Sequence, residues 1–127
     1  MSALAKAIEK VGVTAPSIDG LPAPRVEIAE DRREYNVRYG LEEGATINVS
    51  IFHVKGRFIT CVVPSWVSGG LVTTNLSRIR NFPAKDCPRY SAKRLAEHVA
   101  ESLPMIEQFL TSERVDALIF EAEKSKR

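Results

Sequence analysis

Cysteine is scarce in this sequence, with Cys61 and Cys87 as the two thiols among 127 residues. They stand 26 positions apart and outside any CxxC pattern, so the spacing indicates neither a disulfide framework nor a zinc site. We therefore expect two reduced thiols and a cytoplasmic location.

Long apolar runs are also missing. No stretch approaches the roughly 20 apolar residues that a transmembrane helix needs. The first ten residues, MSALAKAIEK, contain charges and lack the apolar core of a signal peptide. The sequence therefore predicts a protein without a membrane anchor.

The patterns that accompany catalysis and metal binding are absent as well. His53 and His98 each lack a second ligand at metal spacing, and no HExxH motif occurs. The glycines fit no phosphate-binding motif, and we interpret them as turn residues. A nucleophilic pair of Cys61 with His53 is less favoured than an inert buried thiol. We expect a protein that is not an enzyme and holds no metal or cofactor.

What the sequence does contain is a clear pair of strands. Residues 46–63, TINVSIFHVKGRFITCVV, hold two runs of β-branched and aromatic residues around a Lys55-Gly56 turn, which predicts a β-hairpin. A two-residue turn would put Ile51 opposite Thr60 and mix polar with apolar residues on both faces. A three-residue loop, 54–56, with its glycine in the left-handed conformation, is the register that we predict, because it separates the faces better.

The predicted register gives the hairpin one apolar face. That face would carry Ile47, Val49, Ile51, Ile59, Cys61 and Val63. The second face would place Phe52 beside Phe58, next to the cations of the turn. Whether a helix or a binding partner covers these two rings is left open by the sequence.

The segments around this hairpin complete an α+β pattern. Apolar residues at helical spacing predict a helix over 2–11, and the Pro-rich stretch 14–24 follows it as a tether or as an arm laid on the domain. Residues of period two on both sides of the charged cluster EDRRE predict a second hairpin over 26–39. A short edge strand is predicted at Leu71–Thr74.

Helical spacing returns at Ser91, which is a suitable N-cap. Because Pro104 interrupts the pattern, either a kinked helix continues through it or a second helix starts there. A last helix is predicted after Thr111-Ser112. The expected fold is α+β, with an antiparallel meander sheet of four to five strands, a short N-terminal helix and two to three C-terminal helices packed on one face.

A chain of this length suits a single domain. Its parts would be the N-terminal helix and arm (1–24), the antiparallel sheet (25–74), a basic loop (75–90) and the helices (91–124).

Positive charge is concentrated in the middle of the chain. Residues 45–94 carry eight cations and a single carboxylate, Asp86, for a net charge of +7, whereas residues 95–127 carry −3. The eight cations are Lys55, Arg57, Arg78, Arg80, Lys85, Arg89, Lys93 and Arg94. The last two oppose the dipole of the helix that they begin, which we interpret as selection for a cationic surface.

We expect this basic segment to bind nucleic acid, mainly through phosphates. If the hairpin tip and the basic loop share a side of the sheet, five to eight cations can follow a phosphate backbone. Phe52 and Phe58 would offer stacking surfaces for unpaired bases. The opposing interpretation is that a helix covers the two rings and that the acidic helices neutralise the arginines.

A protein-interaction module is the second hypothesis. Trp66, which fits the core equally well, would serve as an aromatic anchor beside the Arg-rich loop and the acidic helices. Such an adaptor, chaperone or inhibitor would dock on a nucleic-acid-processing machine. The edge strand Leu71–Thr74 could also pair with its copy in a homodimer.

Overall fold

The computed structural model describes residues 2–40, 45–68, 71–74, 80–112 and 120, and at 45, 65–68, 71–74, 80 and 81 it describes the backbone alone. The helical elements are α1 (Ala3–Val11), η1 (Glu30–Arg32, one 3₁₀ turn) and α2 (Ala92–Leu110). The strands are β1 (Arg25–Ala29), β2 (Glu34–Gly40), β3 (Ala45–Val54), β4 (Arg57–Ser68), β5 (Leu71–Thr74), β6 (Arg80–Asn81) and β7 (Lys85–Asp86).

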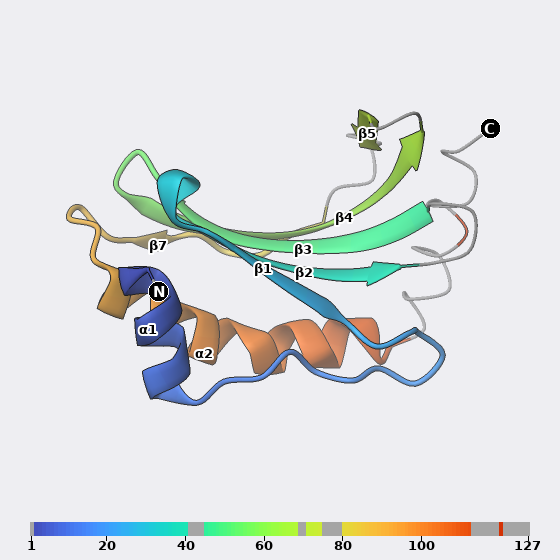
Figure 1. Ribbon diagram of the computed structural model, residues 1–127, viewed down its shortest axis with the longest axis horizontal. Coiled ribbons are helices and arrows are strands. Elements are labelled where there is room, and N and C mark those ends of the chain that lie inside the picture. Colours follow the sequence, from blue (N-terminus) through green and yellow to red (C-terminus); the bar gives the residue numbers. More distant parts are fainter. Residues whose placement is uncertain (1, 41–44, 69–70, 75–79, 113–119, 121–127) are drawn as a thin grey trace.

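Strands β1 to β5 form one antiparallel sheet in chain order, which confirms the predicted meander (Figure 1). The stretch 75–90, predicted as loop, contributes two further short strands. Both pair with β4: β6 at Cys61 and Val62, and β7 at Arg57 and Phe58. The edge of β4 away from β3 is thus covered in turn by β7, β6 and β5.

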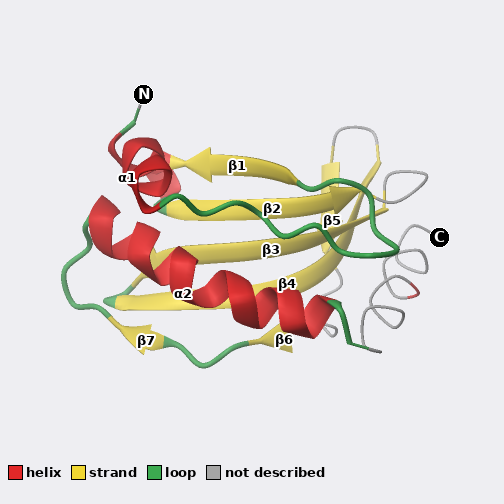
Figure 2. Ribbon diagram, turned by 90° about the horizontal axis from the view of Figure 1, so that it is seen from below, coloured by secondary structure: helices red, strands yellow, loops and turns green. Residues whose placement is uncertain are grey.

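Helices α1 and α2 pack on one face of the sheet, with α2 lying across β3 and β4 (Figures 1 and 2). The described residues contain one C-terminal helix, α2, where two to three were predicted. Helix α1 begins at the N-cap Ser2 and ends at Gly12, whose φ of 72° provides a left-handed C-cap. Helix α2 begins at the N-cap Ser91 and continues through Pro104, so it is one helix up to Leu110. The additional helix predicted after Thr111 falls outside the described residues.

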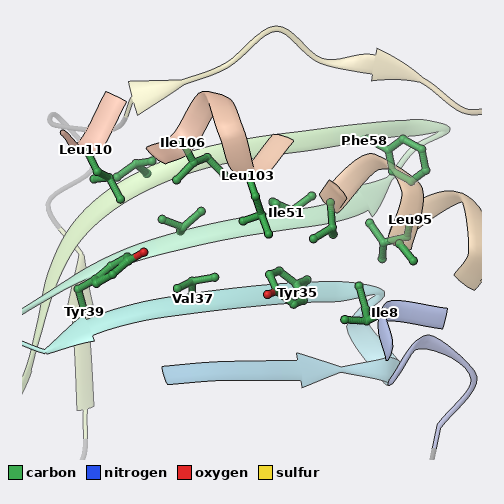
Figure 3. Close-up of a cluster of buried hydrophobic side chains, with 14 of the residues drawn as sticks. Ile8, Tyr35, Val37, Tyr39, Ile51, Phe58, Leu95, Leu103, Ile106 and Leu110 are labelled. Atoms are coloured by element: carbon green, nitrogen blue, oxygen red, sulfur yellow. The ribbon is translucent and has the colours of Figure 1, made fainter. Parts of the chain in front are cut away.

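The core lies between the helices and the sheet (Figure 3). Its fully buried side chains include Tyr35, Val37, Tyr39, Ile47, Val49 and Ile51 from the sheet, and Leu95, Val99, Ile106 and Leu110 from α2. The Pro-rich stretch is an arm laid on this domain, since Ile18 is buried in the core cluster and the hydroxyl of Tyr39 donates to the carbonyl oxygen of Pro16 at 2.6 Å.

The predicted register of the β3–β4 hairpin is wrong. Ile51 stands opposite Thr60, and the loop is the two-residue turn Lys55-Gly56, with φ of 50° and 71°. Positive φ at both positions is the type I′ geometry that matches the twist of paired strands. The left-handed conformation expected for Gly56 is present, but within the shorter turn.

Partners from outside the hairpin explain why the mixed faces are stable. Two polar residues, His53 and Thr60, share the buried face of the hairpin with its aliphatic residues, and both have hydrogen-bonding partners on neighbouring elements. A buried polar group costs little when it is hydrogen-bonded. On the opposite face, Ile59, Cys61 and Val63 are half-buried, so the apolar residues of β4 are divided between the two sides.

The turn gives a first testable prediction. Gly56→Ala should lower the free energy of unfolding by about 1–2 kcal/mol, because an L-residue is strained in the left-handed region. Crowding contributes little, since an added Cβ would lie at an ordinary 3.7 Å from Cα of Pro88. Urea denaturation measures the change.

The matched control is Lys55→Asn in the same turn. Asparagine tolerates a positive φ better than lysine and is favoured in type I′ turns, so this variant should be neutral or more stable. A loss below about 0.5 kcal/mol for Gly56→Ala, which is typical of ordinary surface changes, would contradict the assigned turn.

Candidate functional site

Two segments far apart in the sequence meet at one end of the sheet, where the β3–β4 turn lies against the loop that follows β7. The amide of Cys87 donates to the carbonyl oxygen of Gly56 at 2.8 Å, and Arg57 stands opposite Asp86 in the β4–β7 pairing. Helix α2 starts directly after this loop (Figure 1). Six of the predicted site residues therefore lie on adjoining segments, which we call the basic end: Lys55, Arg57, Lys85, Arg89, Lys93 and Arg94.

Two of the six cations have carboxylate partners. Arg57 Nε lies 3.5 Å from Asp86 Oδ1, and Lys85 Nζ lies 3.1 Å from Glu101 Oε2. The sequence suggested that arginines pair with the acidic helices; in the structure Lys85 pairs with α2, and Arg57 pairs with Asp86 of β7 instead. All four side chains are largely exposed, and exposed ion pairs contribute only about 0–1 kcal/mol.

The other four cations are exposed and make no ion pair with any described residue. They are Lys55, Arg89, Lys93 and Arg94. The first turn of α2 contains no acidic residue, and the amide groups at a helix N-terminus carry partial positive charge. The basic end is thus a surface with excess positive charge.

Two buried histidines, His53 and His98, connect the segments of the basic end to the core. His53 Nε2 donates to the carbonyl oxygen of Cys87 at 2.7 Å, since a carbonyl can only accept, and this bond ties β3 to the basic loop. The His53 ring lies 5.4 Å from both Phe58 and Tyr90, measured between ring centroids. The guanidinium of Arg33 stacks 4.5 Å above Tyr90 and adds a further cation beside this end.

The second histidine, His98, connects α2 to β4. Its ring is stacked on Phe58, with centroids 4.7 Å apart, and its Nε2 lies 3.3 Å from both Thr60 Oγ1 and Ser102 Oγ. Its Nδ1 lies 4.0 Å from Glu101 Oε2. Burial and then the nearby charge of Lys85 lower the pKa of His98 below its usual 6.5, while Glu101 opposes them.

This lowered pKa predicts how stability depends on pH. The neutral ring is favoured in the folded protein, so the unfolded chain binds more protons between the folded pKa and 6.5. The contribution of His98 to stability should therefore be present above pH 6.5 and decrease as the pH falls through the folded pKa. Urea denaturation between pH 8 and 5 measures this loss.

The control for the pH experiment is His98→Asn, which keeps a polar side chain but removes the titration. The difference in unfolding free energy between the two proteins should shrink as the pH falls. A difference that is constant or grows would show that the ring is not held neutral.

The structure contradicts the predicted aromatic platform. Phe58 is 3% exposed and points into the core (Figure 3), whereas Phe52 pairs with Ile59 and lies half-buried on the opposite face. The same register puts Cys61 on the face away from His53, which rules out the pair considered from the sequence. Burial raises the pKa of the Cys61 thiol, and Glu34 adds to that shift.

Three predicted site residues are not placed at the basic end. Arg78 lies outside the described residues. Arg80 is described by its backbone alone and pairs with Val62, four positions along β4 from Phe58. The backbone of Trp66 pairs with β3 and β5, and its side chain is outside the description.

The sequence did not lead us to expect that His53 and His98 connect the basic end to the core. A signal was present for His53, because it continues the period-two series of Ile47, Val49 and Ile51 that points into the core. His98 likewise falls on the buried stripe of α2.

Neither a metal-binding cluster among the described residues nor a match to a known protein accounts for this arrangement. Among the described residues, no group of three or more His, Cys, Asp or Glu side chains could hold a metal ion. No helix in the described part of the chain is both long and apolar enough to span a membrane. Comparison with protein-family models, with curated proteins and with solved structures finds no match to this chain.

Proposed function

We propose that this is a non-enzymatic binding protein whose basic end contacts the phosphates of a nucleic acid. The observation that carries the proposal is the junction of the β3–β4 turn with the basic loop, which gathers six cations. Four of these have no carboxylate partner among the described residues and are therefore available to phosphates. Guanidinium and ammonium groups that neutralise phosphates release counterions, and this release drives binding.

The mode of binding follows from the placement of the aromatic rings. Because Phe58 is buried and Tyr90 is covered by Arg33, stacking on bases contributes little at this end. We therefore propose contacts with the phosphate backbone, largely independent of base sequence.

The test is the salt dependence of binding to a labelled DNA duplex. If four to six phosphates are neutralised, a plot of log affinity against log salt concentration should have a slope of about −4 to −5. The exposed Arg25, at the other end of the sheet from the β3–β4 turn, provides a control, since Arg25→Gln should leave the slope unchanged. Absence of binding at low ionic strength would overturn the proposal.

A protein partner is the second candidate, and one observation favours it. The face of the sheet opposite α1 and α2 carries Phe52, Ile59, Cys61 and Val63 half-buried, and neither of these two helices lies over it (Figure 1). An adaptor, chaperone or inhibitor of a nucleic-acid-processing machine would use such a face, and a homodimer could form through β5. In this case Phe52→Ser, but not charge reversal at the basic end, should abolish binding of the partner.

A further inference from the structure

A like-charge pair stands at the opposite edge of the sheet. The β1–β2 register puts Arg25 directly opposite Arg38 (Figure 2 shows the two strands). Like charges directly opposite each other in an antiparallel pair are destabilising. In this register Ile28 and Val26 of β1 stand opposite the core residues Tyr35 and Val37, so Arg25 and Arg38 are paired and lie on the same face of the sheet.

The neighbouring carboxylates do not balance this charge. Glu27 contacts both Arg38, at 3.3 Å, and Arg32, at 3.4 Å, while Glu34 contacts Arg32 at 3.0 Å. These two carboxylates thus pair with two guanidinium groups, those of Arg32 and Arg38. Arg25 makes no ion pair with any described residue.

The uncompensated charge lies in a groove of about 620 Å³. Its lining includes Pro22, Ala23, Arg25, Glu27 and Arg38. A volume of this size falls in the range of small-molecule sites, and the Pro-Ala pair offers apolar surface beside the cations.

We propose that this groove binds a small molecule carrying a phosphate or carboxylate group, held between Arg25 and Arg38. Planar guanidinium groups match the oxygen geometry of both anions and bind them with charge-assisted hydrogen bonds. The anion supplies a negative charge for Arg25, which no described residue provides. The body of the ligand lies along Pro22 and Ala23.

The experiment uses the full chain and three probes, followed by two-dimensional amide NMR. Phenyl phosphate and benzoate represent the two anion classes, and phenol is their neutral counterpart. Both anions should shift the amides of Ala23 and of residues 25–27 and 38–40, and phenol should not. The anion with the lower dissociation constant identifies the class that the groove prefers.

Arg25→Gln is the decisive variant, because Arg25 has no ion-pair partner among the described residues. It should weaken binding of the preferred anion by about tenfold or more, whereas Lys6→Gln should not change it. Without ligand, the Tm of Arg25→Gln should equal or exceed that of the wild type, because the variant removes a like-charge pair.

Several results would overturn this proposal. These are phenol shifts equal to those of the anions, groove amides that do not respond, unchanged binding in Arg25→Gln, or a lower Tm of that variant without ligand. The proposal is independent of nucleic-acid binding, so charge reversal at the basic end should leave the phenyl phosphate titration unchanged.

Discussion

Phe58→Ala should lower the free energy of unfolding by about 3–5 kcal/mol, the range for deletion of a buried aromatic ring. The ring is 3% exposed, stacks on His98 at 4.7 Å and meets the edge of His53 at 5.4 Å. Its removal leaves a cavity between α2 and the β3–β4 hairpin and takes away the packing that positions both histidines. Urea or thermal denaturation measures the loss.

Phe52→Ala is the matched control in the same hairpin. It deletes the same ring from the half-buried opposite face, so the cost should be at most about half as large. If the two variants were equally destabilised, or the order reversed, the assignment of the faces would be wrong.

Simultaneous reversal of Lys55, Arg89 and Lys93 to Glu should reduce affinity for duplex DNA by about 100-fold or more at low salt. Each lost phosphate contact should also make the log–log salt slope about one unit shallower, so the triple variant should change the slope by about 3. Fluorescence anisotropy at several salt concentrations measures both quantities.

These three residues are chosen because their side chains are exposed and have no carboxylate partner among the described residues. Folding should therefore be nearly unaffected, with changes typical of surface sites. Reversing Arg57 or Lys85 would also break their ion pairs with Asp86 and Glu101 and would be harder to interpret. Unchanged affinity in a folded triple variant would place the phosphate contacts elsewhere or remove them altogether.

Local signals explain which parts of the fold could be predicted. Ser2, Gly12 and Ser91 are capping residues that act within one turn of their helices. The strands on both sides of EDRRE also show their period-two pattern without tertiary help. The meander follows from short connections between such strands.

The hairpin register could not be predicted from the hairpin alone. Thr60 is buried on the core face because His98, 38 positions later in the chain, provides a hydrogen-bonding partner. His53 is buried because the carbonyl group of Cys87, 34 positions away, accepts its N–H. When such distant partners are not known, the register that best separates apolar from polar residues is the better prediction.

The candidate site was only partly accessible from the sequence. The clustering of cations in residues 45–94 is a property of the sequence itself. Their meeting at one end depends on the Cys87–Gly56 hydrogen bond and the β4–β7 pairing, which no local pattern encodes. The arginine pair of the groove likewise required the β1–β2 register.

The three short strands along the far edge of β4 also bear on aggregation. Long unpaired strand edges act as templates for other chains, and proteins protect them by interruption or by charge. In the described sheet, β4 is covered along its length, while the open edge of β1 is five residues long and carries Arg25 and Glu27. Only short strand edges in the described sheet are therefore open to pairing with another chain. The protein should remain dispersed at the concentrations that the titrations require.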